Sequence, residues 1–147
     1  METGLDSRRA EAASRTFVLP IRVYLEDTDA QGVVYNASYF RFMERARTEW
    51  LRAQGVDHDR LRQEHGIALV LASIEAKFKA PARLSDVLYV SAEMIGASGA
   101  RVVFEQKVRR GGEDGQLVCQ GRAEVACMDA TLGKTRRIPA TLTSEWK

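Results

Sequence analysis

The sequence lacks long apolar runs. Its longest one, Ile67–Ala72, is far shorter than the ~18 residues that a membrane-spanning helix needs. Arg8 and Arg9 stand near the start of the chain, but no apolar stretch follows them as it would in a secretory signal. These absences predict a cytoplasmic protein without a membrane span.

Histidine and cysteine are scarce, with two of each in 147 residues. Cys119 and Cys127 fall well apart along one expected strand, farther than the ~7 Å that a disulfide bridges. We therefore expect two buried apolar side chains rather than a disulfide or a zinc site. His58 and His65 lie in a short polar segment, so the sequence gives no sign of a Ser–His–Asp or Cys–His arrangement. Glycine-rich phosphate loops and dinucleotide-binding motifs are missing too.

An excess of charge of one sign is also missing, because 22 Lys and Arg residues face 20 Asp and Glu residues, a net charge of +2. Nucleic-acid-binding domains carry a basic patch, so we expect no nucleic-acid partner. The chain is 45% hydrophobic, as in an ordinary globular protein, and its length suits one domain with a buried core.

The hydrophobic pattern divides the chain into an arm and a domain. Residues 1–16 are polar and aperiodic and predict a flexible N-terminal arm, and residues 17–147 form the expected domain. Apolar and polar residues alternate over Phe17–Leu25, which is typical of a strand. The remaining expected strands are Ile67–Lys79, Val87–Ile95, Arg101–Arg109, Leu117–Met128 and a short fifth, Thr135–Ile138.

A long helix is expected between the first strand and the others. Asn36 and Ser38 are its candidate N-caps, and Gly55 is a candidate stop. Its apolar residues recur with helical spacing: Tyr39, Phe42, Met43, Ala46 and Trp50. A short polar helix over residues 57–64 follows. One amphipathic helix and one antiparallel sheet bury their apolar faces only against each other, which predicts a two-layer α+β fold.

The segment before the long helix holds three carboxylates, from Glu26, Asp27 and Asp29. One interpretation is a solvated acidic turn whose carboxylates accept hydrogen bonds from backbone N–H groups. The other is a reactive site, in which the helix N-terminus polarises a carbonyl group and a nearby carboxylate acts as nucleophile or general base. The spacing leaves both interpretations open.

The run Arg22–Tyr39 resembles the signature of the 4-hydroxybenzoyl-CoA thioesterase family. The match is closest to its Tol–Pal-associated acyl-CoA thioesterase subfamily, through Phe42–Glu49 and Ala80–Leu84 as well. The resemblance covers about Phe17 to Trp146. It implies the hotdog fold, a long helix wrapped by an antiparallel sheet, and an acyl-CoA thioesterase that releases a free acid and coenzyme A.

The resemblance also implies the site. Asp29 takes the position of the catalytic carboxylate, and the backbone N–H near Asn36 holds the carbonyl oxygen. Asp27 is expected to support the loop. The family-like site uses no metal and no separate cofactor, since coenzyme A is part of the substrate. Candidate substrate-binding residues are Tyr35, Tyr39, Arg101, Arg136 and Arg137, of which Tyr39 fits a core role equally well and the arginines also suit plain solvated positions.

Two departures from the family stand beside the site. Asn36 occupies a position where the subfamily usually has histidine, and Gln31 replaces a usual glycine. Asparagine donates hydrogen bonds but does not shuttle protons at neutral pH. This favours a second hypothesis, a non-catalytic module that binds acyl-CoA, acyl carrier protein or partners of the envelope machinery. A hotdog dehydratase would need a histidine near the long helix, which neither His58 nor His65 provides.

Assembly is a further implication of the resemblance. Hotdog domains of this family form homodimers, often paired into homotetramers, with sites between protomers. The alternating strands of this chain suit a sheet that continues into a second copy.

Overall fold

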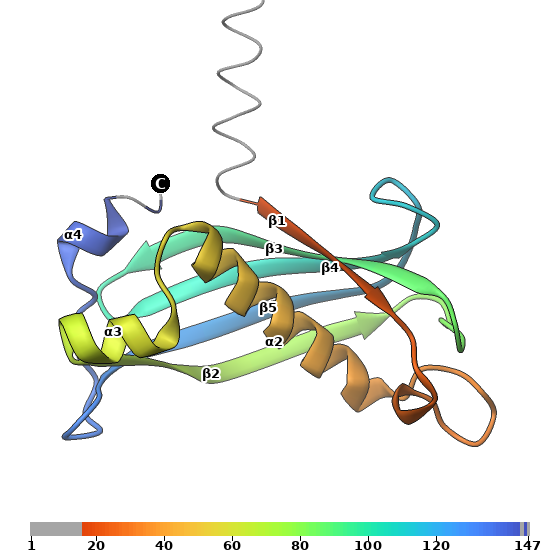
Figure 1. The fold of residues 1–147 in the computed structure, drawn as a ribbon, viewed down its shortest axis with the longest axis horizontal. Coiled ribbons are helices and arrows are strands. Elements are labelled where there is room, and N and C mark those ends of the chain that lie inside the picture. Colours follow the sequence, from red (N-terminus) through yellow and green to blue (C-terminus); the bar gives the residue numbers. More distant parts are fainter. Residues whose placement is uncertain (1–15, 145, 147) are drawn as a thin grey trace, which may run out of the picture.

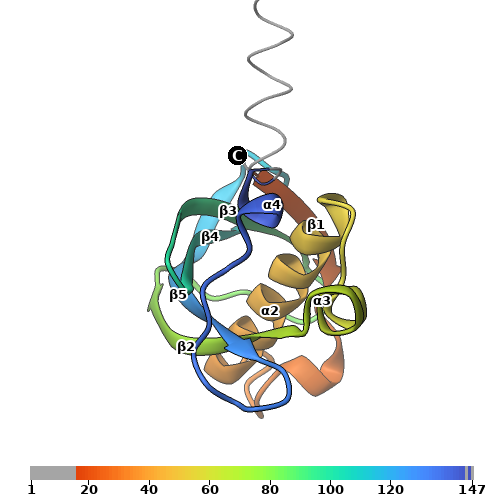
Figure 2. The same ribbon diagram turned by 90° about the vertical axis from the view of Figure 1, so that its left-hand side faces the viewer.

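The computed structural model describes residues 16–144 and Trp146. The order of elements along the chain is β1 (Thr16–Arg22), the 3-10 turn η1 (Leu25–Asp27), α2 (Asn36–Ala53), α3 (His58–His65), β2 (Ile67–Phe78), β3 (Val87–Ser98), β4 (Arg101–Arg110), β5 (Gln116–Asp129) and α4 (Ala140–Thr143). The five strands form one antiparallel sheet in the order β1-β3-β4-β5-β2. Figure 1 shows α2 lying across one face of this sheet, and Figure 2 shows the sheet curving around the helix. The predicted α+β architecture is confirmed.

The core forms where α2 meets the concave face of the sheet. All five residues of the predicted helical stripe are buried, with exposed fractions of 0–3%: Tyr39, Phe42, Met43, Ala46 and Trp50. The ring of Trp50 packs edge-on against Phe104 of β4 at 5.0 Å and against Trp146 at 5.7 Å, measured between ring centroids. Burial of these large side chains is the main stabilising contribution at this end of the helix.

Two residues of the sheet set how closely α2 approaches it. Gly121 on β5 leaves no room for a side chain, because an added Cβ would lie 2.9 Å from Sδ of Met43. Gln106 on β4 is fully buried, and its Nε2 donates to the backbone oxygen of Met43 at 2.9 Å and to that of Ser91 at 3.2 Å. Arg47 donates to Oε1 of Gln106 at 2.8 Å, so this buried amide is hydrogen-bonded at both ends.

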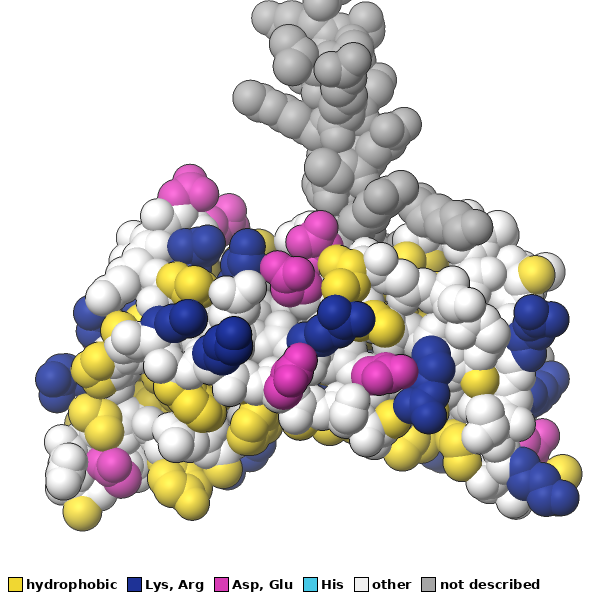
Figure 3. Space-filling model, turned by 180° about the vertical axis from the view of Figure 1, so that it is seen from behind, with side chains coloured by type: hydrophobic (Ala, Val, Ile, Leu, Met, Phe, Trp, Pro, Cys, Tyr) yellow, Lys and Arg dark blue, Asp and Glu magenta, His cyan; other side chains and the backbone are white. Residues whose placement is uncertain are grey.

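The convex face of the sheet carries charges of both signs side by side (Figure 3). Arg122 on β5 stands opposite Glu105 on one side and Glu75 on the other. Arg101 on β4 and Glu124 on β5 form an ion pair at 3.9 Å. Exposed pairs of this kind contribute little to stability.

The structure corrects several expected boundaries. Thr16, assigned to the arm, begins β1 because it pairs with Glu93 in the ladder, and residues 1–15 lie outside the described residues. The first strand ends at Arg22 rather than Leu25, since the chain then turns into η1. The prediction of a short last strand at Thr135–Ile138, after β5, is wrong. Thr135 forms a single bridge with Met128, and Pro139 is the N-cap of α4.

The N-cap prediction is also wrong. Tyr35 is the N-cap of α2, Asn36 is the first residue of the helix, and Ser38 lies within its first turn. Cys119 and Cys127 lie on one strand, β5, and both are buried and free, as predicted.

Candidate active site

Asp29 lies in a tight loop between η1 and α2. The loop is closed by two backbone hydrogen bonds, from Asp29 N–H to the Val33 oxygen at 2.9 Å and from Gly32 N–H to the Asp29 oxygen at 3.0 Å. Gly32 has a φ of 78°, a left-handed conformation that glycine adopts without strain. Oδ1 of Asp29 accepts from the N–H groups of Gln31 at 2.8 Å and Val33 at 3.4 Å. The carboxylate is therefore held by its own loop while its side chain stays exposed.

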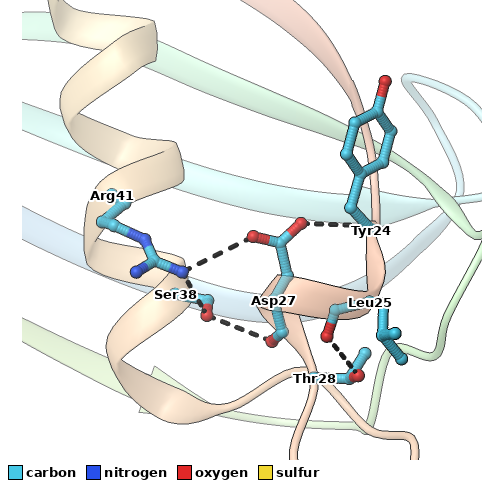
Figure 4. A network of polar contacts seen from close by, with 6 residues as sticks. All are labelled: Tyr24, Leu25, Asp27, Thr28, Ser38 and Arg41. Carbon is cyan, nitrogen blue, oxygen red and sulfur yellow. Dashed lines mark hydrogen bonds and ion pairs between the residues drawn. The ribbon is translucent and has the colours of Figure 1, made fainter.

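Asp27 ties this loop to the first turn of α2 (Figure 4). It is 4% exposed, and its Oδ2 accepts from the backbone N–H of Tyr24 at 2.9 Å. Arg41 lies 3.5 Å from its Oδ1 and also donates to Oγ of Ser38 at 3.0 Å. Ser38 in turn donates to the backbone oxygen of Asp27 at 3.1 Å, and so does the N–H of Tyr35 at 2.9 Å. The predicted supporting role of Asp27 is confirmed.

The N-terminus of α2 follows this anchored loop. Asn36 is the first helical residue, and its backbone N–H belongs to the first turn, which has no intrahelical acceptor. The helix dipole adds partial positive charge at this end. Tyr35, predicted to bind substrate, is 59% exposed at the N-cap position. This end of α2 therefore presents N–H donors and positive potential next to a loop that carries an exposed carboxylate.

A hollow of about 310 Å³ opens beside Asn36. Its lining residues come from the loop between η1 and α2, from α2 itself, and from the end of β2 with the residues that follow it: Val33, Val34, Asn36, Tyr39, Phe78, Lys79, Ala80 and Pro81. The ring of Tyr39 packs against Phe78 at 5.6 Å, and burial raises the pKa of Tyr39 to about 12. Tyr39 thus belongs to the core and lines the hollow at once. The sequence pointed to neither Phe78 nor Lys79, because their distance from Asn36 along the chain hides their proximity in space.

The three predicted arginines lie together at the other end of the molecule. Arg136 donates to the backbone oxygen of His65 at 2.8 Å, where α3 ends and β2 begins. Ile138 N–H bonds to the Gly99 oxygen at 2.9 Å, which brings the segment with Arg136 and Arg137 next to the start of β4 at Arg101. Asp29 precedes the N-terminus of α2, whereas α3 follows its C-terminus, and the helix of 18 residues between them is ~27 Å long. A single chain does not bring these arginines to Asp29.

Two further observations concern the described part of the chain. Among residues 16–144 and Trp146, no group of three or more His, Cys, Asp or Glu side chains is arranged to hold a metal ion. No helix within these residues is both long enough and apolar enough to cross a membrane.

Comparison with known proteins identifies the family. Residues 23–145 match the thioesterase-like superfamily. The acyl-CoA thioester hydrolase YbgC of Escherichia coli is 39% identical over 131 residues, which cover 89% of this chain and 96% of the relative.

Solved structures agree with this assignment. A probable thioesterase from Bartonella henselae superposes with a TM-score of 0.77 at 32% identity, covering 84% of this chain and 99% of the other. A 4-hydroxybenzoyl-CoA thioesterase mutant bound to 4-hydroxybenzoyl-CoA gives a TM-score of 0.81 at 22% identity, covering 90% and 99%, a likeness of fold. The chain belongs to the thioesterase-like superfamily, and its predicted resemblance to the 4-hydroxybenzoyl-CoA thioesterase family, with the hotdog fold, is confirmed.

Proposed function

We propose that this acyl-CoA thioesterase hydrolyses its substrate with Asp29 as the catalytic carboxylate and the N-terminus of α2 as the oxyanion site. Thioester hydrolysis follows from the family and from the Escherichia coli relative, 96% of whose length is matched by this chain. The observation that carries the site is the anchored loop: Asp27 fixes it to α2, and Asp29 stands exposed just ahead of the helix N-terminus.

The chemistry needs few groups. The N–H of Asn36 donates to the carbonyl oxygen and stabilises the negative charge that develops there. In one route, Asp29 takes a proton from a water molecule as the water oxygen bonds to the carbonyl carbon. The carbon–sulfur bond then breaks, and the coenzyme A thiolate takes up the proton. A thiol has a pKa near ~8.5, so sulfur leaves without a strong general acid.

In the second route, Asp29 itself attacks the carbonyl carbon and expels the thiolate. Water then cleaves the mixed anhydride that joins the acyl group to the carboxylate. In a single turnover in ¹⁸O-labelled water, label in the Asp29 carboxylate identifies the second route with attack of water at the aspartyl carbon, because the first route places the label only in the released acid. The proposal assigns no metal and no separate cofactor to either route.

Substrate binding extends from the hollow beside Asn36. We assign the thioester and the first part of the acyl group to this hollow, with Tyr39 as a wall and Tyr35 at its edge. Lys79 is a cation at the same hollow and joins Arg101, Arg136 and Arg137 as a candidate partner for the phosphates of coenzyme A. The three arginines reach such a substrate only from a second copy of the chain.

We infer a homodimer, and a homotetramer built from two of them, with β2 as the edge through which two sheets join. β2 is a terminal strand of the sheet, and Val70, Leu71 and Phe78 on it are 44–48% exposed. An open edge with exposed apolar side chains favours pairing with another strand. Acyl carrier protein remains a proposed alternative carrier of the acyl group. Both cysteines are free, which suits a reducing compartment, and the proposal places the chain in the cytoplasm.

The second candidate function is a module that binds acyl-CoA, acyl carrier protein or partners of the envelope machinery without turnover. It is favoured by one observation, Asn36 at the position where the subfamily usually has histidine, since asparagine does not relay protons at neutral pH.

Release of free thiol from short, long and aromatic acyl-CoAs tests the proposal. Asp29→Asn is expected to lower hydrolysis by at least 100-fold, on the order of a lost general base. Glu26→Gln is the matched control, because Glu26 is an exposed carboxylate three positions away. Activity that survives Asp29→Asn would place the catalytic group elsewhere. A wild-type chain that binds coenzyme A and releases no thiol would favour the binding module.

A further inference from the structure

A second cavity, of about 120 Å³, lies at the other end of α2. It opens between the C-terminal half of the helix and strands β2, β4 and β5, and it shares no lining residue with the hollow beside Asn36. Its walls are mainly apolar, and they include Leu69, Val102, Phe104 and Val125 of the sheet together with Trp50 and Trp146. Four polar residues lie at its rim: Glu44, Arg47, Thr48 and His58.

One wall of this cavity carries a donor without an acceptor. Trp146 is 1% exposed, and its Nε1 has no hydrogen-bond partner among the described residues. A buried indole N–H usually finds a partner, because leaving such a donor unsatisfied costs about 1–3 kcal/mol. The nitrogen itself is fully buried, so Trp146 contributes its apolar ring surface to the cavity wall.

Arg47 at the rim is a cation that forms no close ion pair among the described residues. Arg47 is half-buried, and its Nη1 donates to the neutral amide oxygen of Gln106 at 2.8 Å. Within the described residues it has no Asp or Glu oxygen within 4.0 Å. Glu44, one turn away, accepts from Oγ1 of Thr48 at 3.0 Å and acts on Arg47 only through a longer-range attraction, which opposes the effect of burial on the pKa of Arg47. Burial lowers the pKa of Arg47, which shows that part of its hydration is lost. A guanidinium that is partly desolvated and makes no close ion pair is a strong receptor for a carboxylate.

We propose that this cavity binds a monocarboxylic acid with an apolar tail, the tail against Trp50 and Trp146 and the carboxylate at Arg47. A carboxylate offers two acceptor oxygens to the N–H groups of the Arg47 guanidinium. An engineered protein cavity of ~150 Å³ holds one benzene ring, so the tail is a single ring or a short to medium alkyl chain. Binding at this cavity does not depend on the proposed function, although such acids are the product class of acyl-CoA hydrolysis.

Intrinsic fluorescence reports on this cavity alone, because the only two tryptophans of the sequence, Trp50 and Trp146, both line it. The full chain is titrated with octanoate and, separately, with octylamine, which has the same tail and the opposite charge. We expect a saturable change with octanoate and at least ten-fold weaker binding of octylamine. Equal binding of the two probes, or no change with octanoate, would overturn the proposal.

Variants separate the charge from the tail. Arg47→Met is expected to weaken octanoate binding at least ten-fold and Arg47→Lys to restore most of it, whereas Arg45→Met, at an exposed position of the same helix outside the cavity, leaves it unchanged. Val125→Phe fills the cavity and is expected to abolish binding with the cation intact. Asp29→Asn should bind octanoate as the wild type does, so this site and the catalytic site are tested independently. Octanoate bound equally well by Arg47→Met would contradict the assignment.

Discussion

At the residue scale, Asp27 and Asp29 lie two positions apart but differ in burial and in hydrogen-bond partners. Asp27 is buried, and its hydrogen bonds to Tyr24 and Ser38 hold the loop against α2. Asp29 is exposed, and one of its oxygens accepts two N–H groups of its own loop. The expectation of an acidic turn that caps backbone groups therefore describes part of what both residues do. It does not conflict with a reactive role for Asp29, because a reacting carboxylate must also be held in place.

The residue that departs from the family gives a testable prediction. Asn36→His would place an imidazole at the first position of α2, beside the proposed site of the carbonyl oxygen. We expect hydrolysis to increase, with a new inflection of the pH–rate profile near pH ~6.5, the ordinary pKa of histidine. Initial rates between pH 5 and 9 measure this. A profile identical to that of the wild type would show that the site gains nothing from a proton relay.

At the element scale, the packing of α2 on β5 depends on Gly121. We expect Gly121→Ala to destabilise the fold by about 1–3 kcal/mol, because the new methyl group overpacks against Met43 and the backbone oxygen of Glu75. Urea unfolding followed by circular dichroism measures the loss. Gly96→Ala on β3 is the control, since an added Cβ there has no neighbour within 4 Å and the backbone is not left-handed. Equal losses in the two variants would contradict the close approach.

The helix and the strands after it were predictable because their burial follows a local period. The stripe from Tyr39 to Trp50 faces the sheet throughout, and β5 extends the predicted strand by only one residue at each end. Errors arose where distant partners decide the conformation. Tyr35 becomes the N-cap because its N–H bonds to Asp27, and Thr135 fails to begin a strand because it has one bridge instead of a ladder.

The candidate site was predictable only in part for the same reason. The resemblance supplied Asp29 and Asn36, which are close in the sequence, and the structure places them in one loop and the helix that follows it. Lys79 reaches the same hollow from the end of β2, and no local pattern indicates this. The proposed roles of Arg101 and Arg136 depend on a second copy of the chain, whose position lies beyond any pattern within one sequence.

At the scale of the whole molecule, two buried acids predict how stability depends on pH. Burial raises the pKa of Cys119 from 9.0 to about 11 and that of Tyr39 from 10.0 to about 12. Between pH 9 and 11 the unfolded chain ionises at Cys119 while the folded chain keeps its proton, so stability falls as pH rises. The expected slope is roughly 1 kcal/mol per pH unit for Cys119.

Urea midpoints measured between pH 7 and 11 test this dependence. Cys119→Ala removes one of the two groups, so its midpoint should start lower and decline less steeply. A midpoint that is constant above pH 9, or one that rises, would contradict the buried thiol.

The proposed dimer predicts that a variant at the β2 edge changes the mass of the protein in solution. Val70→Lys places a charge on the exposed β2 edge and is expected to shift the chain toward monomer in sedimentation equilibrium, with a rise of at least ten-fold in the dissociation constant. Ile95→Lys is the control, because Ile95 is 45% exposed on β3, which lies inside the sheet between β1 and β4 and not at its edge. An unchanged mass for Val70→Lys would place the interface elsewhere.

The opposite edge of the sheet, formed by β1, is less suited to pairing with a second copy than the β2 edge. β1 is seven residues long, against twelve for β2, and Pro20 within it has no N–H to offer an incoming strand. A sheet with two receptive edges would add copies indefinitely and grow into a fibre. In the proposed dimer, the two β2 edges pair with each other and leave only the two β1 edges open, so edge pairing is expected to stop at two copies. Pro20 on β1 is therefore expected to disfavour the addition of further copies at that edge.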